Sequence, residues 1–173
     1  MLQLEDFNHE TCLISLQSSA DLILTLEDGE SIHAHRCILH IRSPVLKSAL
    51  QSHDVKSYKL DGPPALLKEL IKFWYSGISP ENLDSIAVRL LPLAAKYETS
   101  GLVEMCLSTI SRILSVFNVV DILILSEELD IPWLFQYSLP LYKANAPSLN
   151  ACSKKKLKDY PDLLLKLTES CAK

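Results

Sequence analysis

The sequence predicts an α+β fold in which a small β-sheet near the N-terminus is flanked and followed by helices. Two short runs of alternating apolar residues, 22–26 and 31–36, lie on either side of Asp28-Gly29. Asp-Gly between such runs is the pattern of a β-hairpin with a tight turn. After Pro64, apolar residues recur at helical spacing almost to the C-terminus.

A third strand and two short helices are expected around the hairpin. Residues 56–60 form the third predicted strand, and Asp61-Gly62 ends it. Ser43 followed by Pro44 predicts a helix start, because serine caps orphan N–H groups and proline suits the first helical position. That helix runs to about residue 50, and a shorter one at 37–42 precedes it.

Three longer helices follow. The first begins after Pro64 and ends at Ser76-Gly77. The second covers residues 83–97 and contains Pro92, which is expected to kink or divide it. The third begins at Thr99-Ser100 and runs to about residue 114.

The last third of the chain is predicted to be helical throughout. Asn118 is expected to cap a helix over 119–128, and Pro132 to start the next one. Pro140 and Pro147 are expected to interrupt that segment. Lys154-Lys155-Lys156, which precedes a last short helix around residues 162–167, is interpreted as a solvated turn (favoured) or as a site for an acidic partner.

Composition argues against several classes of protein. The chain has 173 residues, 48% of them hydrophobic, and a formal net charge of −4, so we expect a protein surface that does not bind nucleic acid. No run of about 18 apolar residues predicts a membrane span, and the N-terminus lacks signal-peptide features. The five cysteines are scattered, which favours free thiols in the cytoplasm or nucleus, with Cys37 and Cys106 as small buried hydrophobes.

No residue pattern predicts an enzyme, a metal site or a cofactor. His33 and His35 are spaced to share a strand face, near His40, but a stable metal site needs three or four converging ligands. Ser43 is interpreted as a helix cap, not a nucleophile, and Glu127-Glu128 as a solvated helix end. Trp74 is expected in the core and Tyr75 at its edge. Trp133 has two interpretations, a core residue (favoured) or an exposed interface anchor.

The N-terminal segment, residues 4–16, has the spacing of an amphipathic helix, with apolar residues Leu4, Phe7, Leu13 and Leu16. It either packs on a partner chain or folds back on its own domain.

Six motifs in order resemble the BTB/POZ domain family. They are ADLIL (20–24), IHAHRCIL (32–39), RSPVL (42–46), LLKELIKFWYSG (66–77), LLPLAAKY (90–97) and LVEMCL (102–107). A further stretch, NVVDILILS (118–126), with YPDL (160–163), resembles the helical BACK-type extension of MATH–BTB proteins such as the speckle-type POZ protein. The resemblance implies a BTB/POZ domain over residues 1–115 and a BACK-like extension over 116–173.

The resemblance also implies a function. Family members form homodimers, here through Leu4, Phe7, Leu13 and Leu16, and many link a bound substrate to a cullin scaffold of a ubiquitin ligase. The corresponding partner-binding face comprises Leu50, His53, Asp54, Val55, Tyr97 and Gly101. Strong cullin adaptors often carry a hydrophobic-x-Glu motif in this loop, whereas residues 51–56 contain no Glu. The alternative is a dimerisation or scaffold module in transcriptional regulation or complex assembly, without a ligase role.

Overall fold

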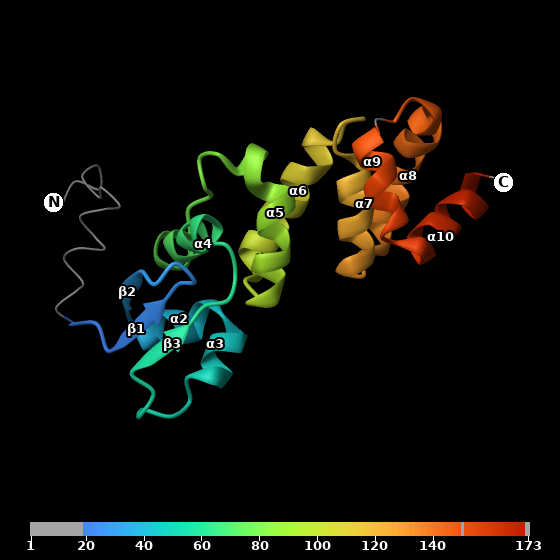
Figure 1. Cartoon of the computed structure of the whole chain (residues 1–173). Helices are drawn as coiled ribbons and strands as arrows, with labels where there is room; N and C mark the ends of the chain where they lie inside the picture. The colour runs from blue at the N-terminus through green and yellow to red at the C-terminus, as the bar shows by residue number, and fades with distance from the viewer. Residues whose placement is uncertain (1–18, 150, 172–173) are drawn as a thin grey trace, which may run out of the picture. The chain divides into compact units, whose positions relative to one another are not determined.

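The computed structural model describes residues 19–149 and 151–171 (Figure 1). The backbone divides into two compact units. Unit 1 comprises the chain up to Leu83 together with Arg89–Met105, and unit 2 comprises Asp84–Val88 and the chain from Cys106 onward. The predicted N-terminal helix, with Leu4, Phe7, Leu13 and Leu16, lies outside the described residues.

The sheet of unit 1 has three strands in the order β2-β1-β3. β1 (Leu22–Thr25) pairs antiparallel with β2 (Ser31–Ala34) and parallel with β3 (Ser57–Lys59). Leu22 and Leu24 point into the core, as the alternation of a strand requires. Gly29 has a φ of +86°, which glycine adopts without strain, and it closes the hairpin turn. The predicted hairpin and third strand are confirmed.

Two short helices join β2 to β3, namely α2 (Arg36–Arg42) and α3 (Pro44–Ala49). Ser43 caps α3 as predicted, because its Oγ accepts a hydrogen bond from the Leu46 N–H at 3.2 Å. Figure 1 shows both helices beside the three strands.

Helix α4 (Pro64–Ser76) contributes six buried apolar side chains to the core of unit 1. Leu67, Leu70 and Trp74 are fully buried along one face, as their spacing predicts. The helix ends at Gly77, whose φ of +69° gives the left-handed C-cap expected from the sequence.

Helices α5 (Leu83–Lys96) and α6 (Ser100–Ile113) each contribute residues to both units. The expected division at Pro92 is wrong, since α5 continues through it. Within unit 1 the same helix buries Leu90, Leu91 and Ala94 completely. Burial of these neighbours offsets the roughly 3 kcal/mol that an interior proline costs.

Unit 2 contains α7 (Val119–Glu128), α8 (Pro132–Asn145), the 3-10 turn η3 (Ala146–Ser148), α9 (Ala151–Lys158) and α10 (Pro161–Cys171). Its core joins apolar side chains of α7 and α8 to Leu149, Leu157, Leu163 and Leu167. None of the helices over the described ranges is long and apolar enough to cross a membrane.

Two predictions for unit 2 are wrong, and a third is confirmed in part. Pro140 lies inside α8 without ending it, and Lys154-Lys155-Lys156 lies in α9 instead of a turn. In both cases a neighbouring apolar side chain, Leu139 or Leu157, packs into the core and favours the helix over its local signal. The third is the helix over 119–128, which is confirmed with Asn118 at its N-cap, although the Asn118 side chain makes no capping hydrogen bond.

Candidate interaction surface

Arg36 organises the loop that connects α3 to β3. The side chain is only 5% exposed, and its guanidinium donates to three backbone oxygens of the loop. Nη1 donates to the carbonyls of Leu50 (2.8 Å) and Ser52 (3.1 Å), and Nη2 donates to that of Val55. A buried charge needs such partners, so the loop takes the shape that the guanidinium fork dictates.

Asp21 holds Arg36 from the opposite side. One carboxylate oxygen lies 3.7 Å from Arg36 Nε, and the other accepts the Arg36 backbone N–H at 2.9 Å. The second contact satisfies a free donor in the first turn of α2, where His35 provides no side-chain cap. At the far end of the loop, the Ile23 N–H donates to the Lys56 carbonyl at 2.9 Å. The loop is therefore fastened at both ends.

A second network ties the start of α3 to the end of α5. The Ser43 hydroxyl donates to the Tyr97 carbonyl at 2.6 Å, and the Tyr97 hydroxyl accepts the Asp61 N–H at 2.9 Å. The Tyr97 ring meets Trp74 edge-on, with ring centroids 5.7 Å apart, and the Trp74 indole N–H donates to Thr99. Burial raises the pKa of Tyr97, so the phenol stays a neutral hydrogen-bonding group.

Lys96 covers this network at the surface. Its ammonium pairs with the carboxylate of Asp61, and the hydrogen bond to Lys96 lowers the pKa of that carboxyl group. Both groups are solvated, so the pair contributes orientation more than stability.

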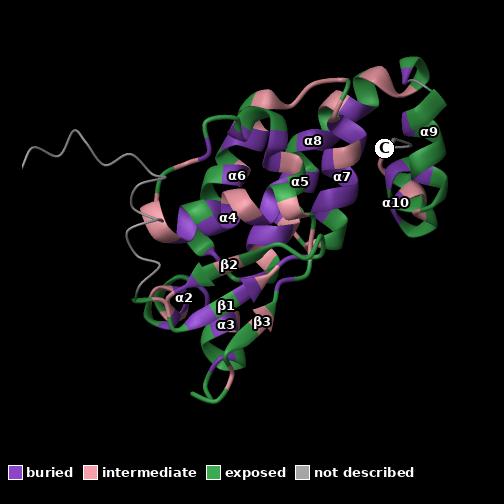
Figure 2. Cartoon of the chain, turned by 60° about the vertical axis from the view of Figure 1, so that its left-hand side comes forward, coloured by how far each residue is buried: buried purple, intermediate pink, exposed green. Residues whose placement is uncertain are grey.

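The residues of the predicted partner-binding face are placed in two layers. His53, Asp54 and Gly101 are exposed and Val55 is half-buried, and Figure 2 shows the loop after α3 coloured mainly as exposed. Leu50 is fully buried and Tyr97 is 2% exposed, which corrects their placement on the face. Leu50 follows the last residue of α3 and Tyr97 follows the last residue of α5, and both side chains pack into the core of unit 1.

His35 is held in unit 1 by hydrogen bonds on both ring nitrogens. Its Nδ1 lies 3.0 Å from the Tyr75 hydroxyl and its Nε2 lies 3.0 Å from the Ser19 hydroxyl. The residue follows β2 and does not share a strand face with His33, which corrects the expected pairing. Across the described ranges, no three His, Cys, Asp or Glu side chains come together as a metal site.

Two further predictions concern burial. Cys106 is buried, and burial raises its pKa to about 12. Cys37 is exposed, because α2 turns Arg36 and Leu39 inward in its place. Trp133 is 49% exposed, so the favoured core interpretation is wrong.

The described part of unit 1 exposes four large apolar side chains. Ile41 on α2 is 81% exposed, and Ile78, Ile23 and Met105 are exposed to a smaller degree. Ile41 precedes Arg42, whose Nε donates to the Trp74 carbonyl, and Ile78 follows Gly77, beside which the Arg42 guanidinium lies. An apolar side chain as exposed as Ile41 becomes favourable to bury when a second protein covers it.

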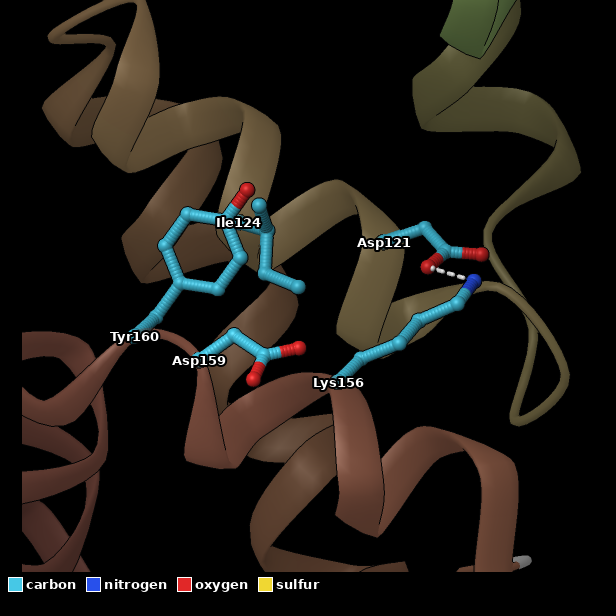
Figure 3. Close-up of a pocket in the computed structure, with 5 residues that line it drawn as sticks. All are labelled: Asp121, Ile124, Lys156, Asp159 and Tyr160. Carbon is cyan, nitrogen blue, oxygen red and sulfur yellow. Dashed lines mark hydrogen bonds and ion pairs between the residues drawn. The ribbon is translucent and has the colours of Figure 1, made fainter.

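Polar contacts in unit 2 fasten α9 and α10 to α7. Lys156 pairs with Asp121 at 2.5 Å across a hollow of about 340 Å³, which Ile124, Asp159 and Tyr160 complete (Figure 3). The Tyr160 hydroxyl donates to Glu128, and Lys166 pairs with Glu127. Glu127 and Glu128 therefore anchor the following helices and are not merely a solvated helix end.

Sequence reasoning missed the roles of Arg36 and Asp21. In the sequence Arg36 appears only as part of a family motif. Its partners are backbone carbonyls, which every residue has, so no pattern of side chains identifies them. An arginine beside the apolar positions of a short helix was the only local signal.

The sequence profile of the BTB/POZ domain family matches residues 13–114, more than half of the chain. The solved BTB domain of zebrafish PATZ1 is similar, with 19% identity and a TM-score of 0.51 over 65% of this chain and 98% of that one. This likeness supports the fold alone. The BACK-like extension and the domain boundary at residue 115 stay predictions. The match over residues 13–114 shows that the chain belongs to the BTB/POZ domain family.

Proposed function

We propose that the chain is a homodimeric protein-interaction adaptor. Family membership over residues 13–114 carries this proposal, because BTB/POZ domains generally act as interaction modules and not as enzymes. Dimerisation presents two copies of each binding surface, so a partner with two sites gains avidity without any new contact.

Exposed apolar residues support the dimer. Ile41 is 81% exposed, and a second chain that covers it would bury this apolar surface favourably. The predicted contact residues are also apolar, namely Leu4, Phe7, Leu13 and Leu16. The test is the mass of the chain by light scattering after size-exclusion chromatography. We expect a dimer for the parent chain and a monomer for Phe7→Asp with Leu13→Asp.

A matched substitution elsewhere on the surface is the control for that experiment. Leu165→Asp replaces an exposed leucine of α10 and should leave the dimer intact. A monomeric parent chain at micromolar concentration would contradict the proposal, as would an unchanged dimer in the Phe7 and Leu13 variant.

We further propose that the loop held by Arg36 binds a cullin-type scaffold. Its support is geometric, since one buried and one partly buried hydrogen bond hold the loop backbone while His53 and Asp54 remain exposed. A pre-shaped loop loses little conformational entropy on binding. Adding the N-terminal region of a cullin should shift the dimer to a larger complex, and His53→Asp with Val55→Asp should abolish the shift.

The control variant carries two new acids elsewhere, Gln136→Asp and Leu165→Asp, at exposed positions of unit 2. It should bind the cullin as the parent chain does.

The absence of Glu from residues 51–56 favours a second candidate function, a dimerisation or scaffold module for transcriptional regulation or assembly. A stable dimer that ignores the cullin would select this second function.

A further inference from the structure

Helix α9 concentrates positive charge on an otherwise acidic chain. Four lysines occur within residues 154–158, and α9 contains no acidic residue, while the whole chain has a net charge of −4. Ser153 and Leu157 are buried one turn apart and define the inward face of the helix. The lysines are therefore distributed around the remaining faces.

One of the four lysines has a structural task. Lys156 pairs with Asp121 of α7, and this hydrogen bond raises the pKa of Lys156. Lys154, Lys155 and Lys158 are exposed, and within the described part of the chain none of them joins an ion pair. We call these three residues the α9 lysine face.

The α9 lysine face is geometrically defined. Lys154 and Lys158 are four residues apart, and Lys155 and Lys158 are three apart, so each pair lies on one side of the helix. Like charges at these spacings repel each other and destabilise a helix of eight residues. Burial of Leu157 and the Lys156–Asp121 pair hold the helix in place despite this repulsion.

One of the three ammonium groups is already oriented. Lys154 Nζ donates to the Pro147 carbonyl of η3 at 3.0 Å. An ammonium group has three donors, so two remain for a ligand. A lysine held in this way loses less side-chain entropy when it binds an anion.

We propose that the α9 lysine face binds an extended acidic segment of a protein partner. Lys154 and Lys158 are separated along the helix by about 6 Å, one turn. Alternate residues of an extended chain are about 6.6 Å apart and point to the same side. Acidic side chains at alternate positions thus match the two lysines, with Lys155 beside them.

Charge distribution favours a short peptide over a large polyanion. Nucleic acid and anionic membranes carry far more negative charge than a short acidic segment, so the net negative charge of the chain repels them more strongly at long range. Helix α9 contains no aromatic residue on which a base could stack and no large exposed apolar residue that could enter a membrane.

The experiment measures fluorescence anisotropy of a labelled peptide with glutamates at alternate positions, titrated with the full chain. Each exposed ion pair contributes a factor of about two to three in affinity, so Lys154→Gln, Lys155→Gln and Lys158→Gln together should weaken binding about tenfold. The control removes the same three charges from scattered exposed sites, Lys47→Gln, Lys59→Gln and Lys143→Gln. It should retain affinity within about twofold, since those charges lie on other elements.

Several outcomes would overturn the proposal. They are an undetectable affinity of the parent chain for the peptide, equal affinity of the α9 variant and the parent, and an equal loss in the scattered control. Lysine-dependent binding to short duplex DNA, or to phosphatidylcholine vesicles containing phosphatidylserine, that exceeds peptide binding would show that the partner class is wrong. The α9 variant should stay folded by circular dichroism, because the buried residues Ser153 and Leu157 and the Lys156–Asp121 pair that hold the helix are unchanged.

Discussion

Removing the guanidinium of Arg36 should destabilise unit 1 and release the loop between α3 and β3. Methionine retains the length and apolar stem of the side chain but leaves the carbonyls of Leu50, Ser52 and Val55 without their donor. Hydrogen bonds to charged groups contribute about 1.5–3 kcal/mol each. Counting about 2 kcal/mol for the buried bond, and about 1 kcal/mol for each of the two partly buried bonds because solvent weakens them, Arg36→Met should cost about 4 kcal/mol.

The assay is urea unfolding followed by tryptophan fluorescence. The chain has two tryptophans, and the exposed Trp133 in unit 2 would obscure the signal, so the background carries Trp133→Phe. The remaining Trp74 is fully buried in unit 1 and reports on its unfolding.

Arg42→Met is the matched control, because Arg42 makes one partly buried hydrogen bond to the Trp74 carbonyl and should cost only about 1 kcal/mol. Arg36→Lys supplies a second variant should the methionine variant fail to fold. A lysine cannot reproduce the fork, so we expect an intermediate loss and faster amide exchange at Val55. Equal losses for Arg36→Met and Arg42→Met would refute the reasoning.

Three other predictions follow from single sites. Gly62→Ala should lower stability by about 1–3 kcal/mol in urea unfolding, because its φ is +150° and a new Cβ would lie 2.6 Å from Leu93 Cδ1. Leu123→Ala should cost about 2–5 kcal/mol, measured by hydrogen exchange of α7 and α8 amides, since Leu123 is fully buried in the unit 2 core. A variant that retains only Cys106 should react with a thiol reagent at pH 8 only after unfolding, whereas one that retains only Cys37 should react at once.

The sign of the cysteine effect follows from its pKa. Burial raises the pKa of Cys106 from 9.0 to about 12, so the folded state favours the neutral thiol. The contribution of Cys106 to stability is complete below pH 9 and is lost as the pH rises toward 12.

Gly29→Ala is the control for Gly62→Ala, because φ is also positive at Gly29 but nothing lies within 4 Å of the new Cβ. An equal loss at both glycines would show that the contact with Leu93 is unimportant.

Local signals in the sequence were sufficient for most of unit 1. Asp28-Gly29, Ser43-Pro44 and Ser76-Gly77 each determine a turn or a helix end through the conformational preference of one or two residues, and the structure confirms all three. Prolines inside helices were weaker guides. At Pro92 and Pro140 the burial of neighbouring side chains outweighed the local cost, and periodicity alone gave no measure of that burial.

The candidate surface could be predicted only in part. The family motifs indicated the region, but they placed Leu50 and Tyr97 on the surface, whereas the folded chain buries both. Whether an apolar residue near a helix end faces solvent depends on which elements pack over it.

The sequence by itself determined the family, the hairpin, the helix starts and the concentration of lysines in residues 154–158, because each depends on residues close together in the chain. Only the tertiary structure decided that Arg36 shapes the loop, that Cys37 is exposed, and that Lys156 turns to Asp121 while three lysines remain outward. These outcomes depend on contacts between segments 14 to 35 residues apart. Such contacts form only when burial of the apolar core brings those segments together.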